Sequence, residues 1–306
     1  MAYMNPIAGR WALTATLCGA GWVSSVGVAA PVDPVESIRS GAAIRVDYVE
    51  AELIAREPAL VPGQTARLGL RLKMDEHWHT YWKNPGDSGL ETSIEWKLPG
   101  GYTPGPILWP APSYFEVGGL AGYGYEGHVV LPVDVSVPAD AAAGSRIDLR
   151  ASVDWLVCRE QCLPGAADLR LELPVVASDD RVQPDPRWAE LFAQAEARSP
   201  RLLPAEASVS ALAGAGAVEL EVAGLGRPTG AATPPEARFF PDTAVQIQMA
   251  GPQAPRWEDG VLRLELSASA IDSVPERLSG VLVVQEPDGV RVFPIQTKVR
   301  RVADRP

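Results

Sequence analysis

The sequence contains few of the residues on which metal and nucleophilic chemistry usually depend. Its 306 residues include three cysteines, three histidines and four methionines. It has no glycine-rich phosphate loop, no nucleophile elbow and no zinc-protease signature, so hydrolase and nucleotide-binding functions lack the residues that they require. After residue 30, no apolar run approaches the length of about 18 residues that a membrane-spanning helix needs.

Basic residues are also scarce, with 27 lysines and arginines against 38 aspartates and glutamates. The formal charge of −11 repels phosphate backbones and anionic lipid head groups, so nucleic acid is not an expected partner. Hydrophobic residues make up 46% and charged residues 21% of the chain, which is close to the globular average. These proportions allow a packed core and exclude a disordered or fibrous class.

Residues 1–30 have the pattern of a secretory signal peptide. Arg10 is their one charged residue, a mildly apolar stretch covers Trp11–Val28, and small residues precede a cleavage site after Ala30. A membrane anchor is the alternative, but glycines and serines make this stretch weakly apolar. We therefore expect an exported protein that loses Cys18 together with the signal peptide.

The rest of the chain has the pattern of a β-rich protein. Its 29 prolines and 28 glycines favour many short elements joined by turns. Apolar and polar residues alternate with period two in segments of both halves, as they do in half-buried strands. In the first half these segments are Ala66–Leu72, Ser93–Leu98, Val129–Val137, Ile147–Leu156 and Ala167–Val175. In the second half they are Ala217–Val222, Ala244–Met249, Leu262–Leu266, Leu278–Gln285 and Val290–Arg300.

We predict an all-β protein with two domains. An antiparallel β-sandwich covers residues 31–180, and a second, smaller β-sandwich covers residues 204–306. Between them, residues 181–203 form a linker with one amphipathic helix over Pro186–Ser199, which Asp185 is placed to cap. The proline- and glycine-rich segment Pro99–Gly127 is predicted to be a long functional loop over one end of the first sandwich.

Cys158 and Cys162 lie in the sequence DWLVCREQCLP and are the residues most suited to chemistry. In an extended strand their α-carbons would be about 13 Å apart, beyond the range of about 4.4 to 6.8 Å that a disulfide allows. The chain must therefore turn between them if they bond. One helical turn, ended by Pro164 and Gly165, would bring them to about 6 Å.

A disulfide between these cysteines would close a ring of five residues. Such a ring stabilises the fold by only about 2 kcal/mol through chain entropy, so it suits reversible thiol–disulfide exchange better than structural cross-linking. Arg159 favours a thiolate and Glu160 opposes one. A structural bridge, a redox pair and half of a metal site all remain open, and the flanking Trp155 and Pro164 favour the redox interpretation.

Two histidines offer a weaker alternative site. His77 and His79 flank Trp78, and on a strand this spacing would point both imidazoles to one face as ligands for copper or zinc. A polar strand face near a turn is the preferred interpretation, and no metal site is expected. Trp78, Tyr81 and Trp82 are interpreted first as core and turn residues, with a partner-docking surface as the alternative.

The sequence resembles the N-terminal periplasmic domain of the DsbD family of thiol:disulfide interchange proteins, including the ScsB-type proteins of copper tolerance. The resemblance rests on His77–Gly89 (HWHTYWKNPGDSG), on the Trp109–Pro132 region that runs into VVLPV, and on Asp154–Pro164 with its two cysteines. It covers about residues 43–176. Residues 200–303 resemble the additional β-rich domain of longer members.

This resemblance implies an immunoglobulin-like sandwich in a periplasmic protein-disulfide reductase that needs no cofactor. Cys158 and Cys162 match the catalytic pair of the family, and Cys162 matches the cysteine that forms the mixed disulfide with partners. Tyr114–Gly127 occupies the position of the cap loop that shields the pair. The residues expected to form the cap or to contact a partner are Phe115, Leu120, Tyr123, Tyr125, Trp155 and Pro164.

The implied function is a relay of reducing equivalents. Electrons would come from a membrane-embedded DsbD-like partner and pass to periplasmic thioredoxin-fold proteins of disulfide isomerisation, cytochrome c maturation or copper tolerance. The chain is expected to be either a standalone module served by a separate membrane protein or a fragment of a longer one. The alternative is a copper-tolerance or assembly module that binds metal or protein and has a purely structural disulfide.

Overall fold

A computed structural model of the chain describes most of the residues after the predicted signal peptide. The described residues are 41–178, 182–214, 216–226, 236–244, 246–268, 274–287 and 289–301. The predicted signal peptide, with Cys18, lies outside the described residues. Among the residues that the structure describes, no helix has the length and apolarity needed to cross a bilayer.

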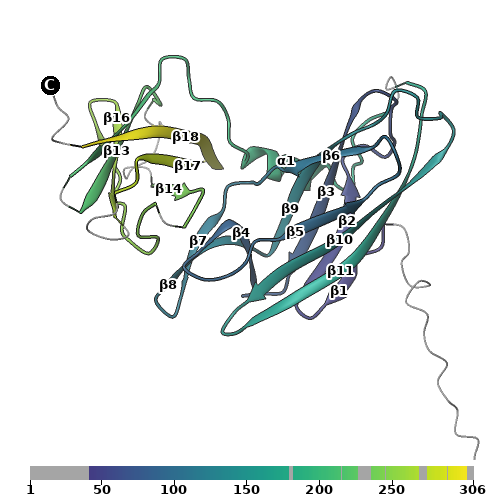
Figure 1. Cartoon of the computed structure of the whole chain (residues 1–306), viewed down its shortest axis with the longest axis horizontal. Helices are drawn as coiled ribbons and strands as arrows, with labels where there is room; N and C mark the ends of the chain where they lie inside the picture. The colour runs from purple at the N-terminus through teal and green to yellow at the C-terminus, as the bar shows by residue number, and fades with distance from the viewer. Residues whose placement is uncertain are drawn as a thin grey trace, which may run out of the picture. The chain divides into compact units, whose positions relative to one another are not determined.

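The first half of the chain forms two antiparallel sheets in a sandwich-like arrangement (Figure 1). One sheet has the order β1-β2-β3-β9-β6. Its strands are β1 (Ile44–Val46), β2 (Val49–Ala55), β3 (Thr65–Met74), β9 (His128–Ser136) and β6 (Thr103–Ile107).

The second sheet has the order β11-β10-β4-β8-β7, and β5 also pairs with β10. Its strands are β4 (His79–Gly86), β5 (Ser93–Lys97), β7 (Ser113–Val117), β8 (Leu120–Glu126), β10 (Arg146–Cys158) and β11 (Cys162–Pro174). β10 and β11 lie side by side as a long hairpin in Figure 1, and their ladder runs without a register shift from Arg146↔Pro174 to Cys158↔Cys162.

Side-chain alternation explains how these strands enclose a core. In β10, every second residue from Leu149 to Val157 is buried, and in β3 the inward residues Leu68, Leu70 and Leu72 are at most 1% exposed. Alternate side chains of a strand point to opposite faces, so each strand contributes one apolar row to the interior. The predicted all-β sandwich class is confirmed.

Helix α1 (Ala189–Ala197) is shorter than the predicted helix and packs against the first half. Its buried residues Phe192 and Ala195 form a small cluster with Ile54 of β2 and Val130 of β9. Asp185 does not cap α1 with its side chain, which instead accepts a hydrogen bond from the Arg187 backbone N–H at 2.9 Å. The helix that was predicted as a connector thus also covers the outer face of the β2-β3-β9 sheet.

The second half contributes seven strands in the order β14-β17-β18-β12-β13-β16-β15. They are β12 (Ser208–Ala213), β13 (Ala217–Ala223), β14 (Ala237–Pro241), β15 (Arg256–Glu258), β16 (Val261–Ser267), β17 (Arg277–Glu286) and β18 (Gly289–Arg301). β18 pairs with β17 along most of its length and, in parallel, with β12 at its end. A separate apolar cluster that includes Leu220, Phe239 and Leu264 fills the space between these strands.

Two predicted elements differ from the structure. The described residues of Ala244–Met249 form bends and turns instead of a strand. Pro99–Gly127 is not a long loop, because it contains β6, β7 and β8. The predicted domain boundaries at residues 180 and 204 stay predictions, and the described residues cluster as one compact unit.

Candidate functional site

A disulfide between Cys158 and Cys162 closes the end of the β10–β11 hairpin. The two cysteines face each other across the ladder with α-carbons 4.1 Å apart, near the value of about 4.5 Å for a non-hydrogen-bonded antiparallel pair. The Arg159 backbone N–H donates to the Gln161 carbonyl at 3.2 Å within the turn. The chain therefore reverses by a tight hairpin turn and not by the helical turn that the spacing also allowed.

The two cysteines differ sharply in exposure. Cys158 is 2% exposed and lies in register with His79 of β4, whereas Cys162 is exposed at the start of β11. Arg159 and Glu160 in the turn lie 3.8 Å apart as an exposed ion pair, so their opposite charges counteract each other near the sulfurs. A protein that approaches this end of the hairpin reaches Cys162 first.

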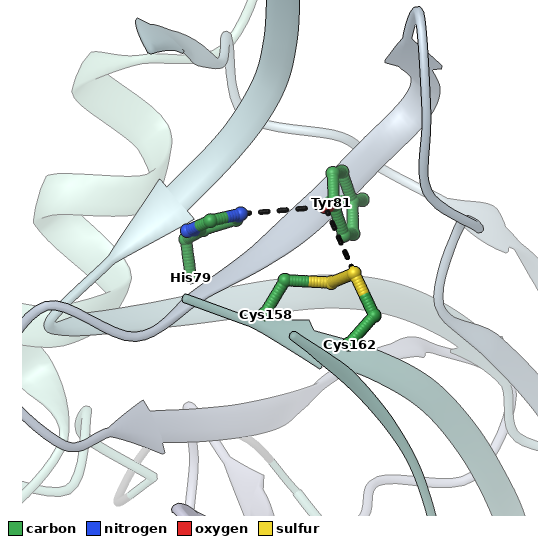
Figure 2. Close-up of a disulfide and its surroundings, with 4 residues drawn as sticks. All are labelled: His79, Tyr81, Cys158 and Cys162. Carbon is green, nitrogen blue, oxygen red and sulfur yellow. Dashed lines mark hydrogen bonds between the residues drawn. A yellow bond between two sulfur atoms is a disulfide. The ribbon is translucent and has the colours of Figure 1, made fainter. Parts of the chain in front are cut away.

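Beside the disulfide, a chain of polar contacts leads into the protein (Figure 2). The Tyr81 hydroxyl lies 3.9 Å from the Cys162 sulfur and 3.3 Å from Nε2 of His79. His79 and Tyr81 are two residues apart on β4, so both side chains leave the same face of that strand. Figure 2 shows the hydroxyl between the imidazole and the sulfur.

Burial controls the protonation of this pair. It lowers the pKa of His79 to about 4 because the charged imidazolium loses solvation, so this histidine is neutral at neutral pH. Burial likewise raises the pKa of Tyr81, against a smaller lowering effect of a hydrogen bond with Ser88. At neutral pH the site therefore holds a neutral imidazole next to a protonated phenol.

The β7–β8 hairpin covers this chain of contacts. The Phe115 ring on β7 lies 4.1 Å from the His79 ring and 6.1 Å from the Tyr81 ring, measured between centroids. Gly122 faces Phe115 across the hairpin, and a β-carbon at Gly122 would come within 1.9 Å of the Phe115 ring. Glycine at this position therefore allows Phe115 to lie over His79.

The tip of the same hairpin is held against the end of β4. The Asp87 backbone N–H donates to the Ala121 carbonyl at 2.8 Å, and the Asp87 carboxylate accepts from the Ala121 backbone N–H at 2.8 Å. At the tip, Val117 is 42% and Leu120 is 49% exposed. The predicted cap segment is thus a β-hairpin with an apolar, exposed tip.

The other residues predicted for the cap or for partner contact have different positions. Tyr123, Tyr125 and Trp155 are at most 6% exposed and belong to the main core cluster, so the structure does not present them to a partner. The Tyr125 hydroxyl donates to the Pro110 carbonyl at 2.7 Å. Pro164 is exposed on the same face of β11 as Cys162 and continues that strand instead of ending a turn.

The histidine pair does not form the shared strand face that its spacing suggested. His77 is exposed in a turn with φ of 68°, and β4 begins only at His79, which is 3% exposed. Nowhere in the described part of the chain do three or more histidines, cysteines, aspartates or glutamates gather in a way that could hold a metal ion.

Tyr81 is the site residue that the sequence interpretation placed elsewhere, among the core and turn aromatics. The i, i+2 spacing that was applied to His77 and His79 also relates His79 to Tyr81, and this second pair is the one that lies on the strand. His79 and Tyr81 share a strand face, and the register of β4 with β10 brings that face to the cysteines.

Comparisons with known proteins identify the first half of the chain. The family described as thiol:disulfide interchange protein DsbD, N-terminal, matches residues 50–174, which include both cysteines. No curated protein sequence matches the chain. The crystal structure of the N-terminal periplasmic domain of ScsB from Proteus mirabilis is similar with a TM-score of 0.57 at 18% identity, over 84% of this chain and 98% of that chain.

Two other solved structures give much weaker similarity. The Ig1-2 module of the Drosophila receptor protein tyrosine phosphatase DLAR gives a TM-score of 0.21 at 12% identity, over 82% of this chain and 98% of that chain. A protein of unknown function from Porphyromonas gingivalis W83 gives 0.24 at 12% identity, over 81% and 99%. The similarity to these two structures is too weak to support a fold assignment, whereas the similarity to the ScsB domain supports the fold. Residues 50–174 form a DsbD N-terminal-like domain.

Proposed function

We propose that the chain is a periplasmic thiol–disulfide exchange module that passes reducing equivalents from a membrane electron-transfer partner to thioredoxin-fold proteins. The observation that carries this proposal is the position of the disulfide. Within the DsbD-type domain, an exposed Cys162 is bonded to a buried Cys158 at the turn end of the β10–β11 hairpin. In this arrangement a partner can reach the Cys162 sulfur, and the buried Cys158 sulfur stays beside it to resolve a mixed disulfide.

The proposed reaction transfers two electrons from a donor to the cysteine pair and then two electrons from the pair to a partner. A dithiol donor first reduces the Cys158–Cys162 disulfide and becomes a disulfide itself. The Cys162 thiolate then attacks a partner disulfide, so a mixed disulfide forms and the first partner sulfur leaves as a thiolate that takes up a proton. The Cys158 thiolate attacks the Cys162 sulfur, which restores the internal disulfide and releases the second partner thiol.

Exposure supports these two roles. Attack on a protein disulfide needs a sulfur that a partner can reach, and Cys162 is exposed, whereas Cys158 is 2% exposed. Resolution needs a second sulfur that stays close, and the β10–β11 ladder keeps Cys158 opposite Cys162. A location in the periplasm fits the same chemistry, since disulfides persist in oxidising compartments.

The test is a trapping experiment with thioredoxin in its disulfide form as the thioredoxin-fold probe. Cys158→Ser should accumulate a covalent complex with the probe that dithiothreitol dissolves, because the resolving sulfur is absent. Cys162→Ser and the double variant should form none, and they serve as matched controls. Equal trapping by both single variants would contradict the assigned roles.

The reduction potential of the pair separates this proposal from a purely structural disulfide. Equilibration of the mature chain in thiol redox buffers should give a value between about −180 and −270 mV, the range of known exchange proteins. A value below about −300 mV is typical of structural bridges and would favour a binding module instead.

A further inference from the structure

The Tyr81 hydroxyl has the geometry to act on the Cys162 sulfur. It lies 3.9 Å from that sulfur in the disulfide form and 3.3 Å from Nε2 of His79 (Figure 2). A disulfide sulfur is a weak hydrogen-bond acceptor, whereas the thiolate formed on reduction carries a full negative charge and is a much stronger one. The contact should therefore shorten and strengthen when the pair is reduced.

His79 determines which way the hydroxyl points. A neutral imidazole carries one N–H donor and one acceptor nitrogen, so Nε2 can either donate to the Tyr81 oxygen or accept from its hydroxyl. When a thiolate forms at Cys162, the tautomer with the proton on Nε2 leaves the Tyr81 hydrogen free for the sulfur. Phe115 packs on the imidazole, and His79 is 3% exposed, so water competes little for Nε2.

We propose that Tyr81 stabilises the Cys162 thiolate of the reduced pair through a hydrogen bond from its hydroxyl, and that His79 is a positioning residue that directs this hydroxyl to the sulfur. This inference rests on the proposed exchange function and assigns its acid–base chemistry. No proton is gained or lost by the two side chains in the stabilised state. Tyr81 donates to the sulfur, and His79 donates to Tyr81.

Other charged groups near the sulfur do not supply the same effect. In the hairpin turn, Arg159 and Glu160 are paired with each other at 3.8 Å. On β8, Glu126 lies in register with His79 and is exposed. On β7, the residue that covers the imidazole is the uncharged Phe115. Among the described residues, the side-chain hydrogen bond to the Cys162 sulfur is the one from the Tyr81 hydroxyl.

The experiment measures the pKa of the Cys162 thiol in the full mature chain. Cys158→Ser isolates the thiol, and the rate of alkylation by iodoacetamide as a function of pH gives its pKa. Adding Tyr81→Phe should raise that pKa by about one unit, because a hydrogen bond to the charged form is lost. Tyr102→Phe is the matched control, since its hydroxyl has no hydrogen-bond partner among the described residues, and it should leave the pKa unchanged.

Two substitutions of His79 test its positioning role. His79→Leu removes the donor to Tyr81 and should also raise the Cys162 pKa, whereas His79→Gln keeps an N–H donor and should restore most of the effect. In the Tyr81→Phe background, His79→Leu should cause no further shift, because it acts through the hydroxyl. An equal shift in both backgrounds would refute the positioning role of His79.

The outcomes for this inference and for the proposed function are separable. An unchanged Cys162 pKa in Tyr81→Phe refutes the inference, even if Cys158→Ser still traps thioredoxin. Absence of trapping together with a potential typical of a structural bridge refutes the proposed function, whatever the thiol pKa. A raised Cys162 pKa in the Tyr81→Phe variant, together with trapping of thioredoxin by Cys158→Ser, supports both.

Discussion

Protonation of the buried His79 should weaken the fold in mild acid. Burial lowers the pKa of His79 from about 6.5 to about 4. Between these values the unfolded chain binds a proton that the folded chain does not, so the free energy of unfolding falls as the pH decreases through this window. Well above pH 6.5 the group is neutral in both states and contributes no pH dependence.

The expected magnitude follows from the same two pKa values. From about pH 7 to about pH 5, proton linkage at this one group removes about 2 kcal/mol from the free energy of unfolding. The cause is desolvation of the imidazole, since His79 is 3% exposed and Phe115 covers its ring, and no charged partner among the described residues contributes to the pKa shift. A loss of this size is a large part of the stability of a typical domain.

The assay is urea unfolding followed by tryptophan fluorescence at both pH values, with the disulfide intact. His79→Gln removes the titrating group, so this variant should lose about 2 kcal/mol less than the parent over the interval. His128→Gln changes an exposed histidine of β9 and should behave like the parent. If the parent and His79→Gln lose stability equally, the buried neutral imidazole is not the cause. In a direct check by NMR, the His79 ring signals should stay unshifted down to about pH 5.

Three further predictions concern packing and the disulfide. Gly122→Ala should destabilise the chain by about 1 to 3 kcal/mol, because the new methyl group overlaps the Phe115 ring. Gly100→Ala is the control: its methyl group meets no atom within 4 Å, so the melting temperature should stay nearly unchanged. Asn84→Ala should cost about 1 to 3 kcal/mol in denaturant unfolding, because Asn84 is buried and its amide donates to the Pro241 carbonyl at 2.8 Å; a loss below about 0.5 kcal/mol would refute this reasoning. Reducing the disulfide should lower the free energy of unfolding by only about 2 kcal/mol, and complete unfolding on reduction at neutral pH would contradict a reversible carrier.

The sequence predicted the long, regular strands well because their side chains alternate. Ile147–Leu156 and Ala167–Val175 lie within or nearly within β10 and β11, where one row of apolar residues faces the core. The same reasoning failed for Ala244–Met249, where an alternating pattern belongs to bends and turns. In that segment Gln246 is buried and its amide exchanges hydrogen bonds with the Ser279 backbone, a tertiary contact that no local pattern reveals.

In Pro99–Gly127 the error was the opposite one, because a loop was predicted where the chain forms strands. Glycines in β8 weakened its strand pattern, yet each of them has a packing role that only the fold reveals. A β-carbon at Gly122 would overlap Phe115, and one at Gly124 would come within 1.9 Å of the Thr80 carbonyl oxygen on the neighbouring strand. Glycine inside a strand often marks such a close approach, and here it permits the hairpin that covers His79.

The candidate site was only partly predictable for a related reason. The cysteine pair could be found from its spacing and its surroundings, because both residues belong to one short segment. Tyr81 lies 81 residues before Cys162, and their contact depends on the order of strands in the sheet, which a single sequence does not encode in any local pattern. Phe115 was identified through the cap segment, but its contact with His79 required the same knowledge of the sheet.

The arrangement of the hairpin fits the requirement of the proposed function that the fold persist in both redox states. A carrier must keep its two thiols together after reduction, or the second cannot resolve a mixed disulfide. Here the disulfide closes a ring of few residues and so contributes little to stability, whereas strands of 13 residues on either side pair along their whole length. The ladder and the core below it therefore hold Cys158 opposite Cys162 whether or not the sulfurs are bonded. If the proposed function holds, we expect reduction to change the charge at the exposed sulfur with little change in the backbone. The Tyr81 hydroxyl, 3.9 Å from that sulfur, could then donate to it without any movement of the strands.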